Sequence, residues 1–364
     1  MTNKTFLKKV QRNSHLLPYI LSPRNNFSRL INEIKILRHA NSPILKYRPR
    51  KLSIYITSRC NLSCNMCGYQ STHSSGEFRT TSRYPDMDLE KFKHILSFFP
   101  EAYSLTLTGE GEPFLNKDIF RMIDYAKNDR HYHIDTSTNG CNLTNRQIQD
   151  LVDSKLDALQ ISLDGTCPAE YKHVRGGTEQ QFKNLVSNIK LIHSLKNSQK
   201  ILLQINLSFI ITMTNYQNIP RMIDFAIELG ADGIHFQNVV DFHTEFAKNN
   251  RPLLTTDTDA INFIDSIRKP PALKRLILPL PYHPNYGNVK HFVPCPHPFA
   301  SIGINTNGNI NPCFQINTNE CFGNIFTELD TWNNGSFQHI RENLLHGRMP
   351  FQLCATCPAF GEGI

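Results

Sequence analysis

The stretch SIYITSRCNLSCNMCGY (residues 53–69) joins a short β-rich run to a loop that carries three of the ten cysteines of the chain. These three, Cys60, Cys64 and Cys67, are separated by three and then two residues. Three thiols are one too few for a closed tetrahedral metal site and one too many for a disulfide. On one tight loop they suit an iron–sulfur cubane with one open iron, although thiolates bind zinc as well. The sequence predicts that a bound small molecule supplies the missing ligand.

Strand-like and helix-like patterns alternate from residue 52 to residue 240. Six β-rich runs span residues 53–57, 104–108, 131–135, 158–163, 202–211 and 233–237. Between them, apolar residues recur at helical spacing, most clearly in 88–99 and 182–192. Strands that are linked by helix-length connections pair in parallel with right-handed crossovers. The chain is therefore predicted to have an α/β fold, a partial (β/α)6 TIM-like barrel.

Polar loops follow the first four of these strands. The cysteine loop follows the first, and GEGEP (109–113), TSTNG (136–140) and LDG (163–165) follow the next three. Ligands of parallel β/α folds bind at the carboxyl ends of the strands. Glycine permits close backbone approach there, while carboxylates and amides orient a polar ligand. The four loops predict one ligand-binding rim.

Composition narrows the class of protein. The chain has 364 residues and a net charge of +8, and much of the basic excess lies in residues 1–51 without an RNA-binding signature. This pattern favours a solvated extension over contact with nucleic acid. The most apolar run (201–213) is too short and too polar to cross a bilayer. We expect a cytoplasmic protein without membrane contact, whose cysteines bind metal rather than form disulfides.

The C-terminal part breaks the alternation. Prolines accumulate up to residue 298, and TNGN (306–309) is suited to a hairpin turn. A segment this short lacks a rich core, so a metal site would stabilise it substantially. The expected regions are a basic, partly helical extension (1–50), the barrel (51–240), a linker (241–294) and a small C-terminal cluster-binding domain (295–364).

The sequence resembles the radical S-adenosylmethionine (SAM) enzymes over about residues 50–240. RCNLSCNMCGY matches their CxxxCxxC signature, and TGEGEP resembles their GGEP motif with Glu110 in place of a glycine. The resemblance implies a [4Fe–4S] cluster on Cys60, Cys64 and Cys67 whose open iron binds SAM, with Glu112 near its amino group. It implies a cofactor pocket formed by Tyr69, Gly109, Glu110, Gly111, Glu112, Asn139, Ser162, Asp164 and Arg175.

The C-terminal segment resembles the SPASM/twitch extension of that family. Cys295, Gly308 and Cys313 fit its CX9–15GX4C opening, and Cys354 and Cys357 supply a CxxC pair. The chain stops seven residues after Cys357, whereas full SPASM domains continue with further cysteines, so the resemblance implies one auxiliary [4Fe–4S] cluster on these four cysteines. Structural zinc is the alternative. Cys321 is a candidate replacement ligand, or a hydrogen-atom donor to a substrate radical.

The resemblance implies reductive cleavage of SAM and abstraction of a hydrogen atom from a substrate carbon. We expect an oxidoreductase that acts on a small carbohydrate- or aminocyclitol-like alcohol, with the auxiliary cluster as electron acceptor. The alternatives are a peptide-modifying enzyme, such as an epimerase or a thioether-forming maturase, and a non-catalytic iron–sulfur sensor. The expected partners are SAM, the substrate and an external one-electron reductant such as flavodoxin or ferredoxin. The sequence does not identify the substrate or a catalytic base.

Overall fold

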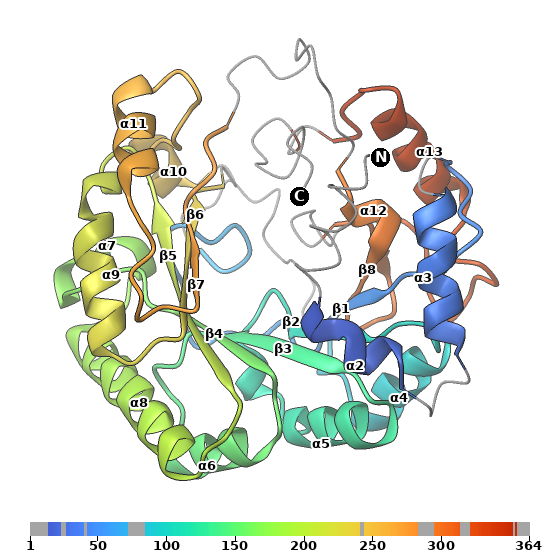
Figure 1. Cartoon of the computed structure of the whole chain (residues 1–364), viewed down its shortest axis with the longest axis horizontal. Coiled ribbons are helices and arrows are strands. Elements are labelled where there is room, and N and C mark those ends of the chain that lie inside the picture. The colour runs from blue at the N-terminus through green and yellow to red at the C-terminus, as the bar shows by residue number, and fades with distance from the viewer. Residues whose placement is uncertain are drawn as a thin grey trace.

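The computed structural model describes residues 14–22, 27–39, 42–71, 84–240, 244–282, 295–313, 321–351 and 354. The strands of these residues form one nine-stranded sheet in the order β7-β6-β5-β4-β3-β2-β1-β8-β9. The sheet curves around the centre of the molecule without closing (Figure 1). The strands are Lys51–Tyr55 (β1), Ser104–Thr108 (β2), His133–Thr138 (β3), Ala158–Ser162 (β4), Gln204–Ile211 (β5), Gly233–Asn238 (β6), Arg275–Ile277 (β7), Ser301–Ile304 (β8) and Ile310–Asn311 (β9).

Neighbouring strands are parallel from β7 to β8, and β8 and β9 form an antiparallel hairpin. The predicted partial barrel is thus confirmed, as is the turn at residues 306–309, where Gly308 has a φ of 89°. Two edges of the sheet were not predicted. The three residues of β7 are too few to show a periodicity, and β8 pairs with β1 although some 250 residues separate them in sequence, roughly the length of a whole barrel domain.

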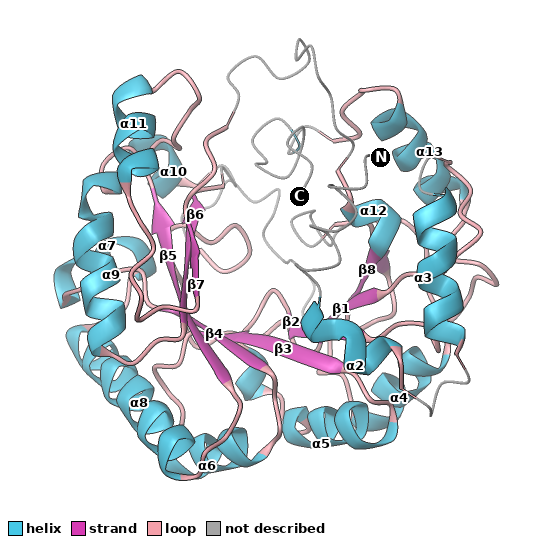
Figure 2. Cartoon of the chain, in the orientation of Figure 1, coloured by secondary structure: helices cyan, strands magenta, loops and turns pink. Residues whose placement is uncertain are grey.

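Helices cover the outside of the sheet (Figure 2). The longer ones between strands are Leu89–Ser97 (α4), Ile119–Asp124 (α5), Asn145–Asp153 (α6), Pro168–Arg175 (α7), Glu179–Ser198 (α8) and Ile219–Glu228 (α9). The N-terminal part contributes Leu17–Ile20 (α2) and Ser28–His39 (α3), and the part after β6 contributes Glu245–Asn249 (α10), Thr258–Ser266 (α11), His297–Ala300 (α12) and Gly335–Leu345 (α13). Shorter helical turns are Ser14–Leu16, Pro113–Leu115, Tyr125–Asp129 and Tyr216–Asn218.

Local sequence explains where these helices begin and which face they bury. Thr144 and Thr178 start α6 and α8 with capping boxes, each paired with a glutamine three residues later. Along α8, Phe182, Leu185 and Ile189 are buried, as their helical spacing predicts. The apolar face packs on the sheet and leaves the carboxyl ends of the strands open for the loops that follow them.

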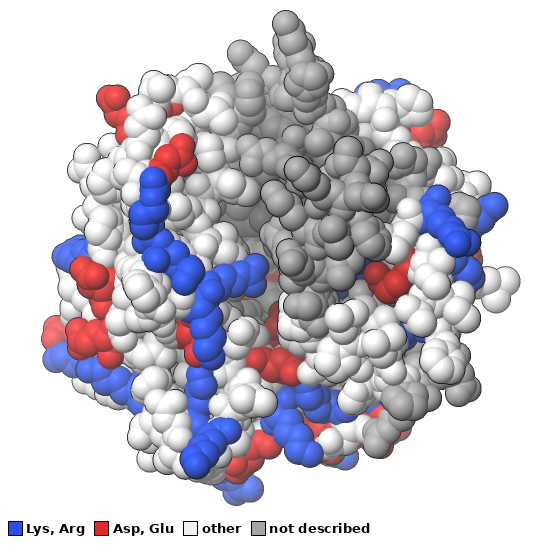
Figure 3. Space-filling model, in the orientation of Figure 1, with Lys and Arg blue, Asp and Glu red and all other residues white. Residues whose placement is uncertain are grey.

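Buried residues of the C-terminal segment belong to the same core as the barrel. Ile302 and Ile304 of β8 are fully buried, and the Trp332 indole donates to the Tyr47 carbonyl at 2.8 Å. This packing holds the segment at the β1 edge of the sheet. None of the described helices combines the length and the apolar character needed to cross a membrane. On the face shown in Figure 3, basic and acidic side chains form small mixed groups on a described surface that is mostly uncharged.

Candidate active site

A cavity of about 660 Å³ lies at the carboxyl ends of the strands. Its walls come from the cysteine loop, the loops after β2, β3 and β4, strands β4 to β7 and the C-terminal segment. All nine residues of the predicted cofactor pocket line it, together with Cys60, Cys64 and Cys67. Four loops that are separate in sequence therefore meet at one cavity, as the position of each loop after a strand predicts.

The three thiols of the cysteine loop are held in a low-polarity setting. Cys64 is buried, and the Cys67 amide donates to its carbonyl at 3.0 Å, which tightens the loop. Burial, opposed by the amide of Leu62 and reinforced by Cys64 and Glu112, raises the pKa of Cys60 to about 12. Burial likewise raises the pKa of Cys67. A bound metal would lower these pKa values and favour the thiolate form.

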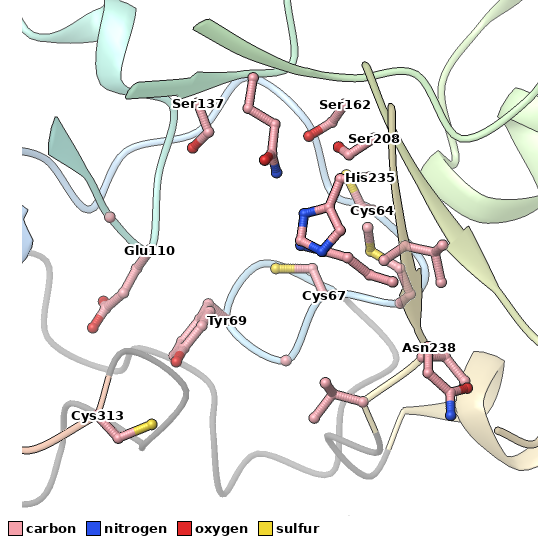
Figure 4. Close-up of a pocket in the computed structure, with 18 of the residues that line it drawn as sticks. Cys64, Cys67, Tyr69, Glu110, Ser137, Ser162, Ser208, His235, Asn238 and Cys313 are labelled. Atoms are coloured by element: carbon pink, nitrogen blue, oxygen red, sulfur yellow. The ribbon is translucent and has the colours of Figure 1, made fainter. Parts of the chain in front are cut away.

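The loop after β2 packs directly on the backbone of the cysteine loop. A Cβ atom at Gly111 would lie 2.1 Å from the Arg59 carbonyl, and one at Gly109 would lie 2.7 Å from the Thr57 carbonyl. The Glu112 amide donates to that Arg59 carbonyl at 2.8 Å. Glycine is therefore required at both positions, and Glu110, which replaces a motif glycine, directs its side chain into the cavity (Figure 4).

Glu112 is buried at the junction of two rim loops. Its Oε1 accepts hydrogen bonds from the Thr138 hydroxyl at 2.7 Å and the Phe114 amide at 3.3 Å, and its Oε2 accepts one from the Asn139 amide at 2.7 Å. Burial still outweighs these donors and raises the pKa of Glu112. A buried carboxylate of this kind is stabilised by a cationic ligand group.

Arg175, at the end of α7, connects the loop after β4 to the cysteine loop. Its Nε donates to Asp164 Oδ2 at 2.5 Å, and its Nη1 lies 3.5 Å from the Cys64 sulfur. Asp164 Oδ1 accepts from the Ile210 amide at 2.6 Å. Burial disfavours the Arg175 charge, but Asp164 and Cys64 outweigh it and raise the pKa of Arg175. A cation thus lies next to the thiols, where it offsets negative charge.

The remaining predicted pocket residues contribute polar groups. Asn139 donates from Nδ2 to the Asn61 side chain at 2.8 Å, and this contact ties the loop after β3 to the cysteine loop. Tyr69 and Ser162 lie on different sides of the cavity, Tyr69 close to Glu110 and Ser162 beyond the cysteine loop (Figure 4).

Three of the four predicted auxiliary ligands line the same cavity: Cys295, Cys313 and Cys354. The fourth, Cys357, lies outside the described residues. Cys321 is exposed and is not among the residues that line the cavity. The roles expected for Cys321, as a replacement ligand or a hydrogen-atom donor, stay predictions.

Sequence reasoning missed a set of inward-facing strand residues. Ser137 (β3), Ser162 (β4), Ser208 (β5) and His235 (β6) face the cavity (Figure 4). Gln160 (β4) also lines it. The available signal was the polar residues at alternating positions within otherwise buried strands, such as Gln160 and Ser162. These five side chains are neutral hydrogen-bonding groups, called the neutral wall below, and the charged Arg275 of β7 lines the same cavity.

His235 adds to this wall as an uncharged group. Burial, followed by the charge of Arg275, lowers the pKa of His235 to about 4. Gln237 Nε2 lies 3.3 Å from His235 Nδ1. At neutral pH the uncharged imidazole offers one donor and one acceptor nitrogen.

The donor set fits iron–sulfur chemistry. Cys60, Cys64 and Cys67 supply soft thiol ligands beside a cation, and a second group of thiols lines another wall of the same cavity. Buried polar atoms without a partner in the described part of the chain, such as the Tyr55 hydroxyl, lie near Cys313. The two sets of cysteines, one on the cysteine loop and one in the C-terminal segment, therefore offer the sulfur ligands that an iron–sulfur cluster requires.

Two family models match the chain. Residues 54–226 match the radical SAM superfamily, and residues 295–358 match the SPASM iron–sulfur cluster-binding domain. The first implies a [4Fe–4S] cluster with SAM, and the second implies auxiliary iron–sulfur binding in place of structural zinc. The predicted resemblance is confirmed in both parts.

Curated proteins match over part of the chain. The chain is 29% identical over 202 residues to a tungsten-containing aldehyde ferredoxin oxidoreductase cofactor-modifying protein of Pyrococcus furiosus, covering 53% of this chain and 52% of that protein. It is 28% identical over 185 residues to a probable GTP 3′,8-cyclase of Methanocaldococcus jannaschii, covering 50% and 56%. The chain spans about half the length of the curated relatives it matches.

Among solved structures, Streptococcus suis SuiB bound to S-adenosylmethionine has the same fold. Its TM-score is 0.66 at 18% identity, covering 98% of this chain and 81% of SuiB. SuiB has also been solved bound to the precursor peptide SuiA. The agreement extends over both the barrel and the C-terminal segment.

Proposed function

The chain belongs to the radical SAM superfamily and carries a SPASM domain, and on this basis we propose that it oxidises an alcohol carbon of a small carbohydrate- or aminocyclitol-like molecule. The observation that carries the proposal is the neutral wall formed by Ser137, Gln160, Ser162, Ser208 and His235, which faces the same cavity as both groups of thiols. Such a wall suits a substrate recognised through hydroxyl and amine groups.

In the proposed site, Cys60, Cys64 and Cys67 hold the [4Fe–4S] cluster. Glu112 orients the SAM amino group, because a buried carboxylate with a raised pKa gains most from a cationic partner. Arg175 offsets the negative charge of the thiolate ligands and keeps Asp164 paired. Cys295, Cys313, Cys354 and Cys357 hold the auxiliary cluster.

When bound, SAM and the clusters supply a 5′-deoxyadenosyl radical that takes one hydrogen atom from the alcohol carbon, and a site for the electron that the substrate radical gives up. The hydroxyl proton leaves to a water molecule, and the product is a ketone or an aldehyde. The role of the chain itself is to hold the carbon in place. The electron that starts cleavage comes from an external reductant such as flavodoxin or ferredoxin.

Isotope tracing tests the proposal. The reconstituted full chain is incubated anaerobically with SAM, a reductant and alcohols that carry deuterium on the carbinol carbon. We expect deuterium in 5′-deoxyadenosine and a product lacking two hydrogens. A matched incubation with peptides deuterated at Cα tests the competing candidate, which has the SuiB–SuiA complex as its precedent. Transfer from the peptides and not from the alcohols would overturn the proposal.

A further inference from the structure

Tyr55 and Asn311 carry buried polar groups that nothing in the described ranges satisfies. Tyr55 ends β1 and is 5% exposed, and Asn311 ends β9 and is fully buried. The Tyr55 hydroxyl and both polar atoms of the Asn311 side chain lack a hydrogen-bond partner. A buried polar group without a partner is costly, so groups of this kind usually indicate a position where a ligand, an ion or a water molecule binds.

The two side chains meet over Gly303 of β8. Gly303 pairs with Asn311 across the hairpin. A Cβ atom at Gly303 would lie 3.3 Å from the Asn311 Cβ and 3.7 Å from the Tyr55 hydroxyl. The glycine thus leaves room for a tyrosine from the barrel to reach the first hairpin of the C-terminal segment. The orphan groups form one cluster built from both parts of the chain.

This cluster adjoins one of the proposed auxiliary ligands. Cys313 follows Asn311 by two residues and lines the cavity. Asn311, two residues before Cys313, and the Tyr55 hydroxyl both lie near Gly303, so Cys313 follows directly on this cluster in the chain. Figure 4 shows Tyr69, Glu110 and Cys313 together on one side of the cavity. The Tyr55 O–H and the Asn311 Nδ2–H are hydrogen-bond donors.

We propose that Tyr55 and Asn311 donate hydrogen bonds to the sulfur atoms around Cys313 and thereby raise the reduction potential of the auxiliary cluster. Hydrogen bonds to sulfur are among the factors that set the potential of an iron–sulfur cluster, because they stabilise its more negative, reduced state. These two positioning residues make electron acceptance from the substrate radical easier. The inference rests on the proposed function, in which Cys313 is a cluster ligand.

A redox titration followed by electron paramagnetic resonance tests this inference in the reconstituted full chain. In Tyr55→Phe we expect the auxiliary signal at more negative potentials than in the wild type, with an unchanged potential for the three-cysteine cluster. Asn311→Leu should shift the auxiliary signal in the same direction. Tyr132→Phe is the matched control, because it removes a buried hydroxyl that precedes β3, at the amino-terminal end of the strand, and donates to the Phe99 carbonyl.

The outcomes separate this inference from the proposed function. If the wild type holds both clusters and oxidises its substrate while Tyr55→Phe titrates at the wild-type potential, only the tuning role is overturned. If Tyr55→Phe loses the auxiliary iron, the residue is needed to build the site and the tuning role is again overturned. If the wild type itself binds a single cluster, the proposed electron acceptor fails, and the inference fails with it.

Discussion

The amino-terminal ends of the strands carry charged side chains that are paired with one another, whereas the carboxyl ends carry thiols, neutral polar groups and the charged Glu112, Asp164 and Arg175 around a cavity. Before β4, Asp157 accepts from the Tyr19 hydroxyl at 2.6 Å and forms an ion pair with Lys127. Before β6, Asp232 forms ion pairs with Lys196 and Lys274. At this end of the barrel, the charged groups are used to hold helices against the sheet.

The carboxyl ends differ in what their polar groups contact. Ser162 and Gln160 face the cavity, and Tyr55 and Asn311 have no partner in the part of the chain that the structure describes. Polar side chains that make few contacts within the protein contribute little to folding and are available to bind a ligand. Paired groups such as Glu112 and Arg175 line the cavity as well as wall residues such as Ser162, so position at the cavity, more than pairing, separates functional from structural polar residues in this chain.

Replacing a thiol at the carboxyl ends should have the largest effect on activity. Cys64→Ala removes one of three proposed cluster ligands, so we expect loss of about four irons per chain and no 5′-deoxyadenosine above background. Iron assays and product quantification check this. Cys167→Ala, at the start of α7 and outside the cavity lining, is the control and should retain both. Full activity in Cys64→Ala would contradict the assignment of Cys64 as a cluster ligand.

Arg175→Met should lower both stability and activity, because Arg175 forms a buried ion pair with Asp164 and also lies next to Cys64. Asp164, with a side-chain exposure of 1%, would lose its counter-ion, and breaking such a pair costs about 3–5 kcal/mol of unfolding free energy. Iron retention should fall as well, by about 10- to 100-fold in affinity. Urea denaturation and iron content measure the two effects. A stable variant with normal iron would show that the pair serves neither purpose.

Asp232→Asn should lower stability by about 3 kcal/mol and leave the chemistry intact. Burial opposes ionisation, but the Ile205 amide, Lys196 and Lys274 outweigh it and lower the pKa of Asp232 below its ordinary value of 3.8. The unfolded chain therefore takes up the proton first, so this stabilisation is present above about pH 4 and is lost as the pH falls through the lowered pKa. Unfolding measured from pH 7 to pH 3 should be less acid-dependent in Asp232→Asn. A loss of turnover at pH 7 in the folded variant would contradict the view that the charged pairs at the amino-terminal ends of the strands serve stability and not catalysis.

Gln160→Leu should produce the smallest change. Leucine fills a similar volume but cannot hydrogen-bond, and one such bond contributes about 0.5–1.5 kcal/mol, or about 2- to 13-fold in kcat/KM. We expect this loss without a fall in Tm, measured by steady-state kinetics and thermal unfolding. Gln149→Leu, on α6 and outside the cavity lining, should leave kcat/KM unchanged. Equal effects in the two variants would remove Gln160 from the substrate wall.

Much of the fold could be predicted because it rests on local patterns. The six strands that were expected between residues 53 and 237 all occur, since period-2 and helical spacings report on burial directly. The pairing of β8 with β1 could not be predicted, because it depends on contacts between distant segments. The rim loops were found through their glycines and cysteines. The neutral wall was missed although its polar residues alternate with buried apolar ones, as Gln160 and Ser162 do in β4. The Tyr55–Asn311 cluster was missed because a tyrosine or an asparagine at the end of a strand has no sequence signal that separates a ligand-binding position from a core position.

Two-cluster radical chemistry at the carboxyl ends of the strands is tested by anaerobic reconstitution with iron and sulfide, followed by addition of reductant and SAM. We expect about eight irons per chain, from two four-iron clusters, and formation of 5′-deoxyadenosine. About four irons with turnover would remove the auxiliary cluster and the electron-acceptor role. A fully loaded protein that cleaves no SAM, with or without candidate alcohols, would contradict the assignment of radical chemistry to this cavity.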